Sequence, residues 1–281
     1  MDEPPVTGSV DGVTVHRAGR VVQVNALPET GTMTVDLPVP QVALAVGAHP
    51  DDVELGAGGT LAKWAAAGCQ VHILVLTDGA KGTWDPARDP TSLVATRQDE
   101  QREAARRLGS NDVGFFGWPD GELRNGIREQ WDVCRWIRST RPDVVLGHDP
   151  WRRYRLHPDH RNAGFILTDS IVAARDPLFF PDQDVPPHRP RALLLWEADV
   201  PNHVEDVSGY VDTKVHALLA HRSQFETTLG LAPDTVTDDL AASPGSDAVE
   251  QFGARTRQQL AEHGRAGGGD LGECFHLIDD L

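Results

Sequence analysis

The sequence predicts an α/β fold of the Rossmann-like type, with a mostly parallel sheet and helices on both faces. Short apolar runs of strand length alternate with helical-looking segments, and polar residues follow the strands. A chain of 281 residues with 40% hydrophobic content can bury one substantial core. We therefore expect a single domain at residues 41–281, preceded at residues 1–40 by a strand-bearing extension of short β-branched alternations.

The first predicted unit is a strand, a helix and a second strand. Residues 42–46 form a continuous apolar run, residues 61–68 are helical in composition and end in glycine, and residues 71–77 form another apolar run. Two buried strands joined by one short helix make a right-handed unit with parallel strands. The residues expected to shape the turn into this helix are Glu54, Gly56, Gly58 and Gly59.

The alternation of helix and strand continues along the chain. The next predicted elements are a helix, a strand, a helix and a strand, at residues 95–108, 113–116, 130–140 and 143–148. The stretch 235–269, rich in Asp, Ala, Ser and Gly, is expected to be a mobile loop or lid before a short apolar segment at 274–278. In such a sheet the ligand crevice lies beyond the carboxyl ends of the strands, so polar residues there are candidates for function.

Charge and composition narrow the range of partners. A formal net charge of −16 argues against nucleic acid and anionic membrane surfaces, and favours a neutral or cationic small molecule. No run approaches about 20 consecutive apolar residues and no signal segment is apparent, so we expect a cytoplasmic protein without membrane insertion. Cys69, Cys134 and Cys274 are too scattered to predict disulfides or a zinc knuckle. The sequence does not decide whether the protein forms a homo-oligomer.

Two polar clusters follow predicted strands. Ala-His-Pro-Asp-Asp at 48–52 follows the first core strand, and His-Pro-Asp-His at 157–160 follows the strand that ends near residue 148. Two imidazoles and one carboxylate leave metal positions open for water and substrate, which is typical of a catalytic site. One such cluster alone would be an ordinary turn with a helix cap, but two at the same sheet edge favour a metal site.

These segments resemble the PIG-L/LmbE superfamily of metal-dependent N-deacetylases, which includes N-acetylglucosaminyl lipid, mycothiol-pathway and antibiotic-sugar deacetylases. The likeness spans about residues 42–225. Besides the two histidine clusters it includes Arg97 with Glu100, Pro119–Gly121, Asp206–Ser208 with Lys214, and His221–Gln224. It implies a hydrolase that depends on Zn²⁺, with Fe²⁺ or another divalent metal as the alternative.

The resemblance implies a role for each matching residue of the clusters. His49, Asp52 and His160 would hold the metal, and Asp51 would be the general base on the metal-bound water. A protonated His157 would stabilise the oxyanion that forms when the amide carbonyl is attacked. A zinc-bound water titrates near pH ~7, so a weak base such as a carboxylate is adequate.

Other residues are expected to support these. Arg97 and Asp120 match positions that line the sugar pocket in the resembling family, although a helix-face salt bridge and a Pro-Asp-Gly turn would explain them equally well. Asp159 is expected to accept a hydrogen bond from a histidine as part of the second shell of contacts around the metal. Structural hydrogen bonds beneath the site are expected from His221, Ser223 and Gln224.

The loop before the second cluster departs from the family pattern. Mycothiol-pathway members carry a tyrosine close before this cluster, whereas here Tyr154 is displaced among Arg152, Arg153 and Arg155. These arginines would either face an anionic substrate group or be solvated loop charges, and the second alternative is slightly favoured. The substrate's identity is left open by this departure.

The predicted activity is hydrolysis of a non-peptide C–N amide bond, removing an N-acyl group, expected to be acetyl, from an amino-sugar-containing small molecule. An amidase acting on a thiol conjugate or a natural-product intermediate is one alternative. An Fe(II) oxygenase would use a similar set of ligands, but the strand–helix context of His49 argues against it. The third alternative is a catalytically silent homologue that only binds a small molecule. The presence of Asp51 and His157 counts against this alternative.

Overall fold

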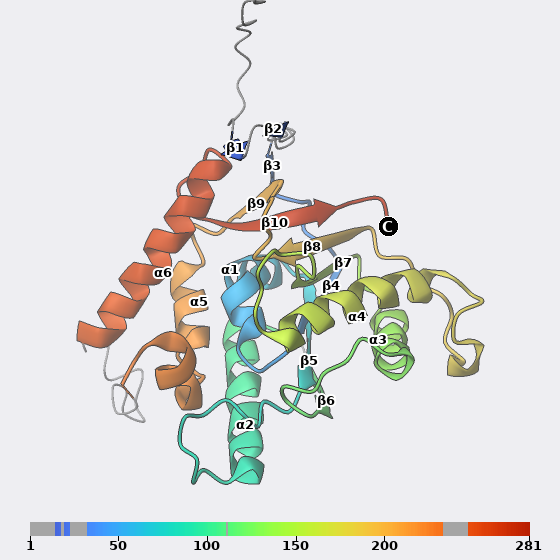
Figure 1. Cartoon of the computed structure of the whole chain (residues 1–281), viewed down its shortest axis with the longest axis horizontal. Helices are drawn as coiled ribbons and strands as arrows, with labels where there is room; N and C mark the ends of the chain where they lie inside the picture. The colour runs from blue at the N-terminus through green and yellow to red at the C-terminus, as the bar shows by residue number, and fades with distance from the viewer. Residues whose placement is uncertain (1–14, 18–19, 23–32, 111, 233–246) are drawn as a thin grey trace, which may run out of the picture. The chain divides into compact units, whose positions relative to one another are not determined.

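The structure is a computed structural model that describes residues 15–17, 20–22, 33–110, 112–232 and 247–281 (Figure 1). The chain divides into two compact units, Met1–Thr32 and Met33–Leu281. Within the first unit, β1 (Val15–Arg17) pairs antiparallel with β2 (Arg20–Val22). The predicted domain boundary at residue 40 stays a prediction.

The second unit is built on one eight-stranded sheet with the order β3-β9-β10-β8-β7-β4-β5-β6. Its strands are β3 (Thr34–Val35), β4 (Val42–Gly47), β5 (Gln70–Thr77), β6 (Asp112–Trp118), β7 (Val144–His148), β8 (Ala192–Trp196), β9 (His203–Asp206) and β10 (Gly272–Ile278). Paired neighbours are parallel, except that β10 runs antiparallel to β8 and β9. The predicted mostly parallel sheet is confirmed.

Helices cover both faces of this sheet (Figure 1). They are α1 (Asp52–Ala66), α2 (Pro90–Leu108), α3 (Ile127–Thr140), α4 (Pro158–Arg175), α5 (Val211–Leu218) and α6 (Asp247–Ala266). Alternate residues of β4 point to opposite faces, so Leu44 packs in the cluster with α3 and α4 while Ala43 packs in the cluster with α1. None of the helices described is long and apolar enough to cross a bilayer.

The direction of strand addition reverses at β4. From β4 the chain adds β5 and β6 on one side, and β7 and β8 then lie on the other side. Strands β4 and β7 are parallel neighbours, with Ala43 opposite Val144 and Val46 opposite Gly147. Their carboxyl ends therefore open one crevice at the switch point, where doubly wound sheets bind ligands.

The predicted start of the first helix at residue 61 is wrong, because α1 begins at Asp52, although its backbone leaves helical geometry at Ala57 (φ −145°), among the glycines that were expected to form a turn. A Cβ atom added to Gly56 would lie 2.5 Å from Trp196 Cδ2, and one added to Gly59 would lie 2.9 Å from Val207 Cβ. Glycine lowers helix propensity, but here it permits close packing of the helix against its neighbours. Tertiary contacts therefore explain the glycines, and the local signal for a turn coincides with the break in α1 at Ala57.

The predicted mobile loop or lid at 235–269 is wrong for residues 247–266, which form α6. Phe252 and Leu260 of this helix are buried in a cluster with Val211 and Val215 of α5. Residues 235–246 of that stretch lie outside the described residues. The buried positions recur every four residues, but the surrounding Ala, Gly, Gln and Arg residues hide this spacing in the composition.

The other predicted elements are present with shifted ends. Helix α2 begins at Pro90, five residues before the predicted start at 95, because the Asp89 side chain accepts a hydrogen bond from Ser92 N at 2.8 Å and caps the helix. Proline suits this first position, since its missing N–H would have had no partner within the helix. Helix α3 begins at Ile127 and β6 extends to Trp118.

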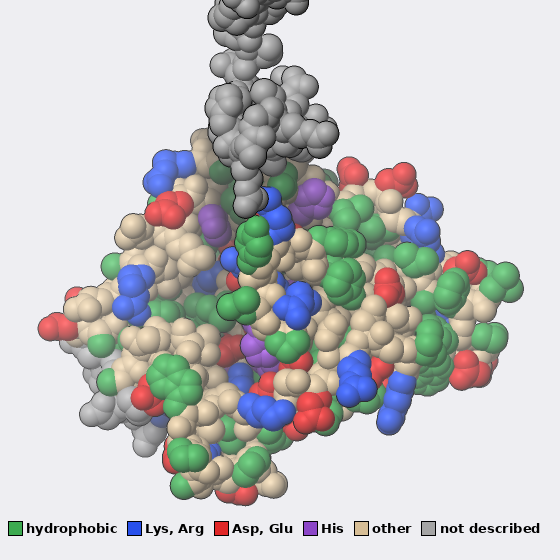
Figure 2. Space-filling model, in the orientation of Figure 1, with side chains coloured by type: hydrophobic (Ala, Val, Ile, Leu, Met, Phe, Trp, Pro, Cys, Tyr) green, Lys and Arg blue, Asp and Glu red, His purple; other side chains and the backbone are tan. Residues whose placement is uncertain are grey.

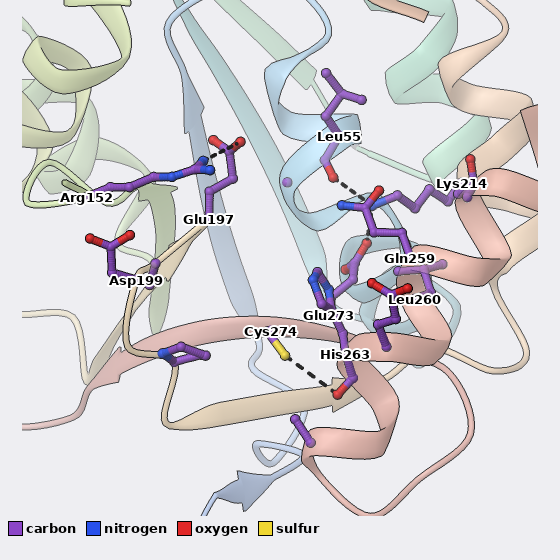
Figure 3. Close-up of a pocket in the computed structure, with 16 residues that line it drawn as sticks. Leu55, Arg152, Glu197, Asp199, Lys214, Gln259, Leu260, His263, Glu273 and Cys274 are labelled. Carbon is purple, nitrogen blue, oxygen red and sulfur yellow. Dashed lines mark hydrogen bonds and ion pairs between the residues drawn. The ribbon is translucent and has the colours of Figure 1, made fainter. Parts of the chain in front are cut away.

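A buried ion pair joins α1, α5 and β10 (Figure 3). Lys214 Nζ lies 2.6 Å from Glu273 Oε1 and donates to the Leu55 carbonyl at 2.8 Å. Glu273 also accepts hydrogen bonds from the backbone N–H groups of Gly59 and Thr60, at 2.9 and 2.8 Å. The two charged side chains are only 6% and 2% exposed, so each depends on the other to compensate for lost solvation.

Replacing Lys214 with Met should leave Glu273 buried without a charged partner. We expect the free energy of unfolding to fall by about 3–5 kcal/mol, as measured by urea denaturation. The matched control is Arg102→Gln, which removes a pair with Asp99 whose side chains are 54% and 81% exposed, and should change stability by less than about 1 kcal/mol. Equal losses in the two variants would contradict the role given to this pair.

Candidate metal centre and active site

Side chains from two neighbouring strand ends meet in the crevice between β4 and β7. His49 and Asp52 follow β4, and His160 lies in the first turn of α4, which follows β7. His49 Nδ1 lies 3.3 Å from His160 Nε2 and 3.4 Å from Asp52 Oδ2. His160 Nε2 lies 3.3 Å from Asp52 Oδ1. The three predicted metal ligands are thus brought together.

The two separations of 3.3 Å, from His160 Nε2 to His49 Nδ1 and to Asp52 Oδ1, fit a small divalent ion. Two ligand atoms about 2.1 Å from a tetrahedral metal lie about 3.4 Å apart. His49, Asp52 and His160 form one of the groups whose potential ligand atoms all lie within 4.8 Å of one another. Among the described residues, the other such groups are His49 with Asp120 and His157, and His148 with His160 and Glu197.

Asp52 is held in place through one of its two oxygens. Oδ2 accepts a hydrogen bond from His49 N at 2.7 Å and lies 3.1 Å from His148 Nε2. Oδ1 is the oxygen nearer to His160. Burial raises the pKa of Asp52, but His160 and His148 outweigh this and hold it well below its usual value. The carboxylate is therefore ionised and suited to bind a cation.

The other nitrogen of His49 faces two further carboxylates. His49 Nε2 lies 3.1 Å from Asp120 Oδ1 and 3.2 Å from Asp159 Oδ2. Burial lowers the pKa of His49, but hydrogen bonds to Asp120, Asp159 and Asp52 outweigh it and raise the pKa well above the usual value. A carboxylate on the far nitrogen fixes a metal-binding imidazole, and this is the contact that the role predicted for Asp159 requires.

Asp51 adopts an unusual backbone conformation at the start of α1. Its φ is 108°, and its N–H donates to Gln101 Oε1 at 3.0 Å. Among the described residues, Asp51 Oδ2 has no hydrogen-bond partner and lies 3.5 Å from Arg97 Nη2. Burial raises the pKa of Asp51, although the nearby charge of Arg97 opposes this. A strained, buried carboxylate with a free oxygen is suited to accept a proton.

Arg97 and Asp120 both line a cavity of about 380 Å³ that opens over these residues. Arg97 is 3% exposed and donates to the carbonyls of Gly79 and Pro50 at 2.9 and 2.6 Å, so it also braces the loop that carries Asp51. The exposed side chain of Trp84 lines the same cavity. Figure 2 shows histidine and acidic side chains next to one another near the centre of the visible face.

His157 caps the N-terminus of α4. Its Nδ1 accepts a hydrogen bond from Asp159 N at 3.3 Å, which leaves Nε2 to carry the proton. Burial lowers the pKa of His157, and the neighbouring His49 and His160 lower it further. The ring stacks on His160 with centroids 4.6 Å apart. His157 is therefore a neutral donor beside the three candidate ligands.

Of the three residues expected beneath the site, Ser223 and Gln224 make hydrogen bonds as predicted, whereas the ring nitrogens of His221 have no hydrogen-bond partner among the described residues. His221 Nε2 lies 3.4 Å from Glu54 Oε2, and Glu54 Oε1 accepts a hydrogen bond from Gln101. Hydrogen bonds to Glu100 and to the Gly82 carbonyl come from Ser223 and Gln224. Gln101 donates to Glu54 and also accepts a hydrogen bond from the Asp51 N–H, so the residues beneath the site support the backbone of Asp51.

The arginine-rich loop is tied to acidic residues that follow β8. Arg155 is buried and pairs with Glu197. Arg152 Nη1 also lies 3.0 Å from Glu197 Oε1, a contact drawn in Figure 3, and Arg153 Nε lies 3.3 Å from Asp199 Oδ2. The structure matches neither of the two predicted alternatives for these arginines, which were contact with an anionic substrate group and full solvation as loop charges. They are charges paired within the protein rather than freely solvated, and their partners are not substrate groups.

Comparisons with known proteins find a family model and curated relatives that this chain resembles. A family model described as PIG-L, GlcNAc-PI de-N-acetylase, matches residues 44–171. The chain is 34% identical to the diacetylchitobiose deacetylase of Thermococcus kodakarensis over 185 residues, 65% of this chain and 69% of that protein. It is 33% identical to the 1D-myo-inositol 2-acetamido-2-deoxy-alpha-D-glucopyranoside deacetylase of Streptomyces scabiei over 170 residues, which is 51% of this chain and about half of that relative (52%).

A solved structure is similar over most of its length. The N,N'-diacetylchitobiose deacetylase from Pyrococcus horikoshii, complexed with its inhibitor MPG, superposes with a TM-score of 0.74 at 28% sequence identity. The match covers 85% of this chain and 84% of that one. The α/β fold is therefore shared with a deacetylase.

The ion pair between Arg155 and Glu197 should make the free energy of unfolding depend on pH in the acidic range. Burial raises the pKa of Glu197, but contacts with His148 and Arg155 lower it to about 2. Because this lies below the value of ~4.3 in an unfolded chain, the ionised Glu197 stabilises the fold above that pH, and the contribution is lost as the pH falls towards 2. The side chain is 46% exposed, so solvent screening limits the contribution to about 1 kcal/mol.

We therefore expect Glu197→Gln to unfold more easily than wild type above pH ~5, with the difference shrinking between pH ~4 and ~2. Urea denaturation at a series of pH values measures this. A difference that stays constant over the whole range would show that the charge of Glu197 is not responsible.

Proposed function

The chain belongs to the PIG-L family, and we propose that it is a zinc-dependent hydrolase that removes an N-acetyl group from an amino-sugar-containing small molecule. The reaction would cleave a non-peptide C–N amide bond with water, giving acetate and a free amine. The observation that carries the proposal is the meeting of His49, Asp52 and His160, with His160 Nε2 3.3 Å from both His49 Nδ1 and Asp52 Oδ1, beside an Asp51 oxygen that has no hydrogen-bond partner among the described residues.

The donor set indicates the kind of metal. Two imidazoles and one carboxylate suit Zn²⁺, and Fe²⁺ or another divalent ion is the alternative. A zinc ion held by His49, Asp52 and His160 would polarise the amide carbonyl and make water more acidic. The carboxylates of Asp120 and Asp159, behind His49, add negative charge that favours a cation at this position.

Asp51 would act as the general base. Burial raises the pKa of Asp51 towards neutral pH, and its Oδ2, 3.5 Å from Arg97 Nη2, accepts no hydrogen bond among the described residues and can take a proton from water. After water has attacked the carbonyl carbon and the C–N bond breaks, Asp51 can return this proton to the nitrogen of the leaving amine. Arg97 donates to the Pro50 carbonyl and Gln101 accepts from the Asp51 N–H, so both hold the backbone that carries this carboxylate.

His157 would stabilise the negative charge that develops on the carbonyl oxygen. Its Nδ1 is occupied by the backbone of Asp159, so Nε2–H is the donor available to this oxygen. A well-placed donor of this kind contributes about 3–4 kcal/mol to the transition state. No positive charge on His157 is required, in keeping with its lowered pKa.

The cavity supports an amino-sugar substrate. Arg97 and Asp120 line it, and we propose that they help to recognise sugar hydroxyls, although both also make the internal contacts described above. Trp84, 69% exposed at the same cavity, offers an aromatic surface for a sugar ring. An amide of a thiol conjugate would undergo the same chemistry, and only assays with both substrates separate the two.

Amine release from a panel of N-acetylglucosaminides, diacetylchitobiose and an S-conjugate amide tests this function. Asp51→Asn should keep about one metal ion per chain and lose about 10²–10⁴-fold in kcat, because the general base is gone. His160→Ala should lose both the metal and the activity, because a ligand is gone. If Asp51→Asn were as active as wild type, or wild type bound no metal, the proposed mechanism would be wrong.

His157 can be tested by separating its two nitrogens. His157→Asn keeps an acceptor that caps α4, but it removes the Nε2 donor. We expect kcat to fall about 10²–10³-fold, while thermal stability and metal content stay close to wild type. His157→Ala, which also loses the cap, should show a similar fall in kcat and in addition a lower melting temperature. Wild-type turnover in His157→Asn would refute the donor role.

A further inference from the structure

The contacts that hold Asp52 continue into the protein through His148, the last residue of β7. His148 Nε2 lies 3.1 Å from Asp52 Oδ2. On the other side of the ring, Nδ1 lies 3.0 Å from Trp196 Nε1 and 3.0 Å from Arg155 Nη1. The residue is 1% exposed, so these protein groups, rather than solvent, set its hydrogen bonding.

The neighbours of His148 determine which nitrogen carries the proton. The indole N–H of Trp196 and the guanidinium of Arg155 can only donate hydrogen bonds. The acceptor Glu197 Oε2 is farther from Nδ1, at 3.8 Å, than the two donors at 3.0 Å, so we assign Nδ1 as the acceptor and the ring proton to Nε2. Nε2–H then donates to Asp52 Oδ2, so the direction of this hydrogen bond is fixed from the far side of the ring.

We propose that His148 is a positioning residue that selects which oxygen of Asp52 faces the metal. Oδ2 receives two hydrogen bonds, from His49 N at 2.7 Å and from His148, whereas Oδ1 lies 3.3 Å from His160 Nε2 on the side of the ligand group. With Oδ2 engaged, Oδ1 is left to bind the cation. The inference rests on the proposed function, because it concerns the geometry of the same metal centre.

The arginine-rich loop has a role in this arrangement. Arg155 is 8% exposed and is held against His148 by its pair with Glu197. Glu197 also contacts Arg152, and its φ of 58° is an uncommon backbone conformation for a residue other than glycine. Glu197, Arg155 and His148 thus form a chain that ends on Asp52.

A second metal site is the competing explanation for this cluster. Potential ligand atoms of His148, His160 and Glu197 do lie within 4.8 Å of one another. However, a guanidinium 3.0 Å from His148 Nδ1 would repel a cation there, and Nε2 is engaged by Asp52. The geometry therefore favours one metal ion per chain, with His148 behind its carboxylate ligand.

The test measures Co²⁺ binding to the metal-free full chain by chelator competition and by the visible absorption spectrum. His148→Leu removes the donor and should weaken Co²⁺ binding about 10–100-fold and change the spectrum. His148→Gln supplies an amide N–H in place of Nε2–H and should recover most of the affinity. The matched control is His203→Gln, a buried histidine that contacts Thr34 and Glu205, which should leave Co²⁺ affinity unchanged.

Trp196→Phe provides a test that keeps His148 itself. It removes one donor to Nδ1 and retains an aromatic ring, so it should weaken Co²⁺ binding several-fold if the hydrogen-bond direction matters. This variant decides the question if His148→Leu does not fold. Wild-type affinity and spectrum in every folded variant would overturn the inference, as would two Co²⁺ ions per chain with one lost in His148→Gln. If wild type bound no Co²⁺, the proposed function would fail first, and the inference with it.

Discussion

The parallel pairing of β4 with β7 is the constraint on which the site depends. The two strands are far apart in sequence, and only their adjacency at the switch point brings the cluster at 48–52 to the cluster at 157–160. A slip of one residue in this pairing would turn the buried side chains of a strand to the opposite face, so the hydrophobic core fixes the register. Core packing therefore sets the separations among the candidate ligands.

The site concentrates negative charge where water has little access. Asp51, Asp52, Asp120 and Asp159 are each at most 6% exposed, and buried carboxylates are costly unless cations or hydrogen bonds compensate. The histidines supply part of this compensation, and Arg97 supplies another part. A divalent ion would supply the remainder, so the electrostatics and the ligand distances independently favour a metal centre.

The sequence predicted the parallel strands β4 to β7 and the two histidine clusters that supply the candidate ligands, because both leave local signals, whereas β8 and β9 were not predicted. Buried strands appear as continuous apolar runs, and the histidine clusters follow directly after two of them. Helix boundaries were less accurate where tertiary contacts decide them, as at the glycines of α1 and along α6. The antiparallel placement of β10 between β8 and β9 could not be predicted, because the pairing of distant strands leaves no local pattern.

His148 was missed because its role depends on partners from three other segments. Its ring contacts Asp52 from α1, Trp196 from β8 and Arg155 from the loop after β7. Gly56 is part of the same arrangement, since a side chain there would collide with the Trp196 indole that donates to His148. A glycine that weakens the helix locally thus permits the packing that fixes a metal-facing carboxylate. The departures from local helix propensity in α1 occur where the candidate site requires close approach.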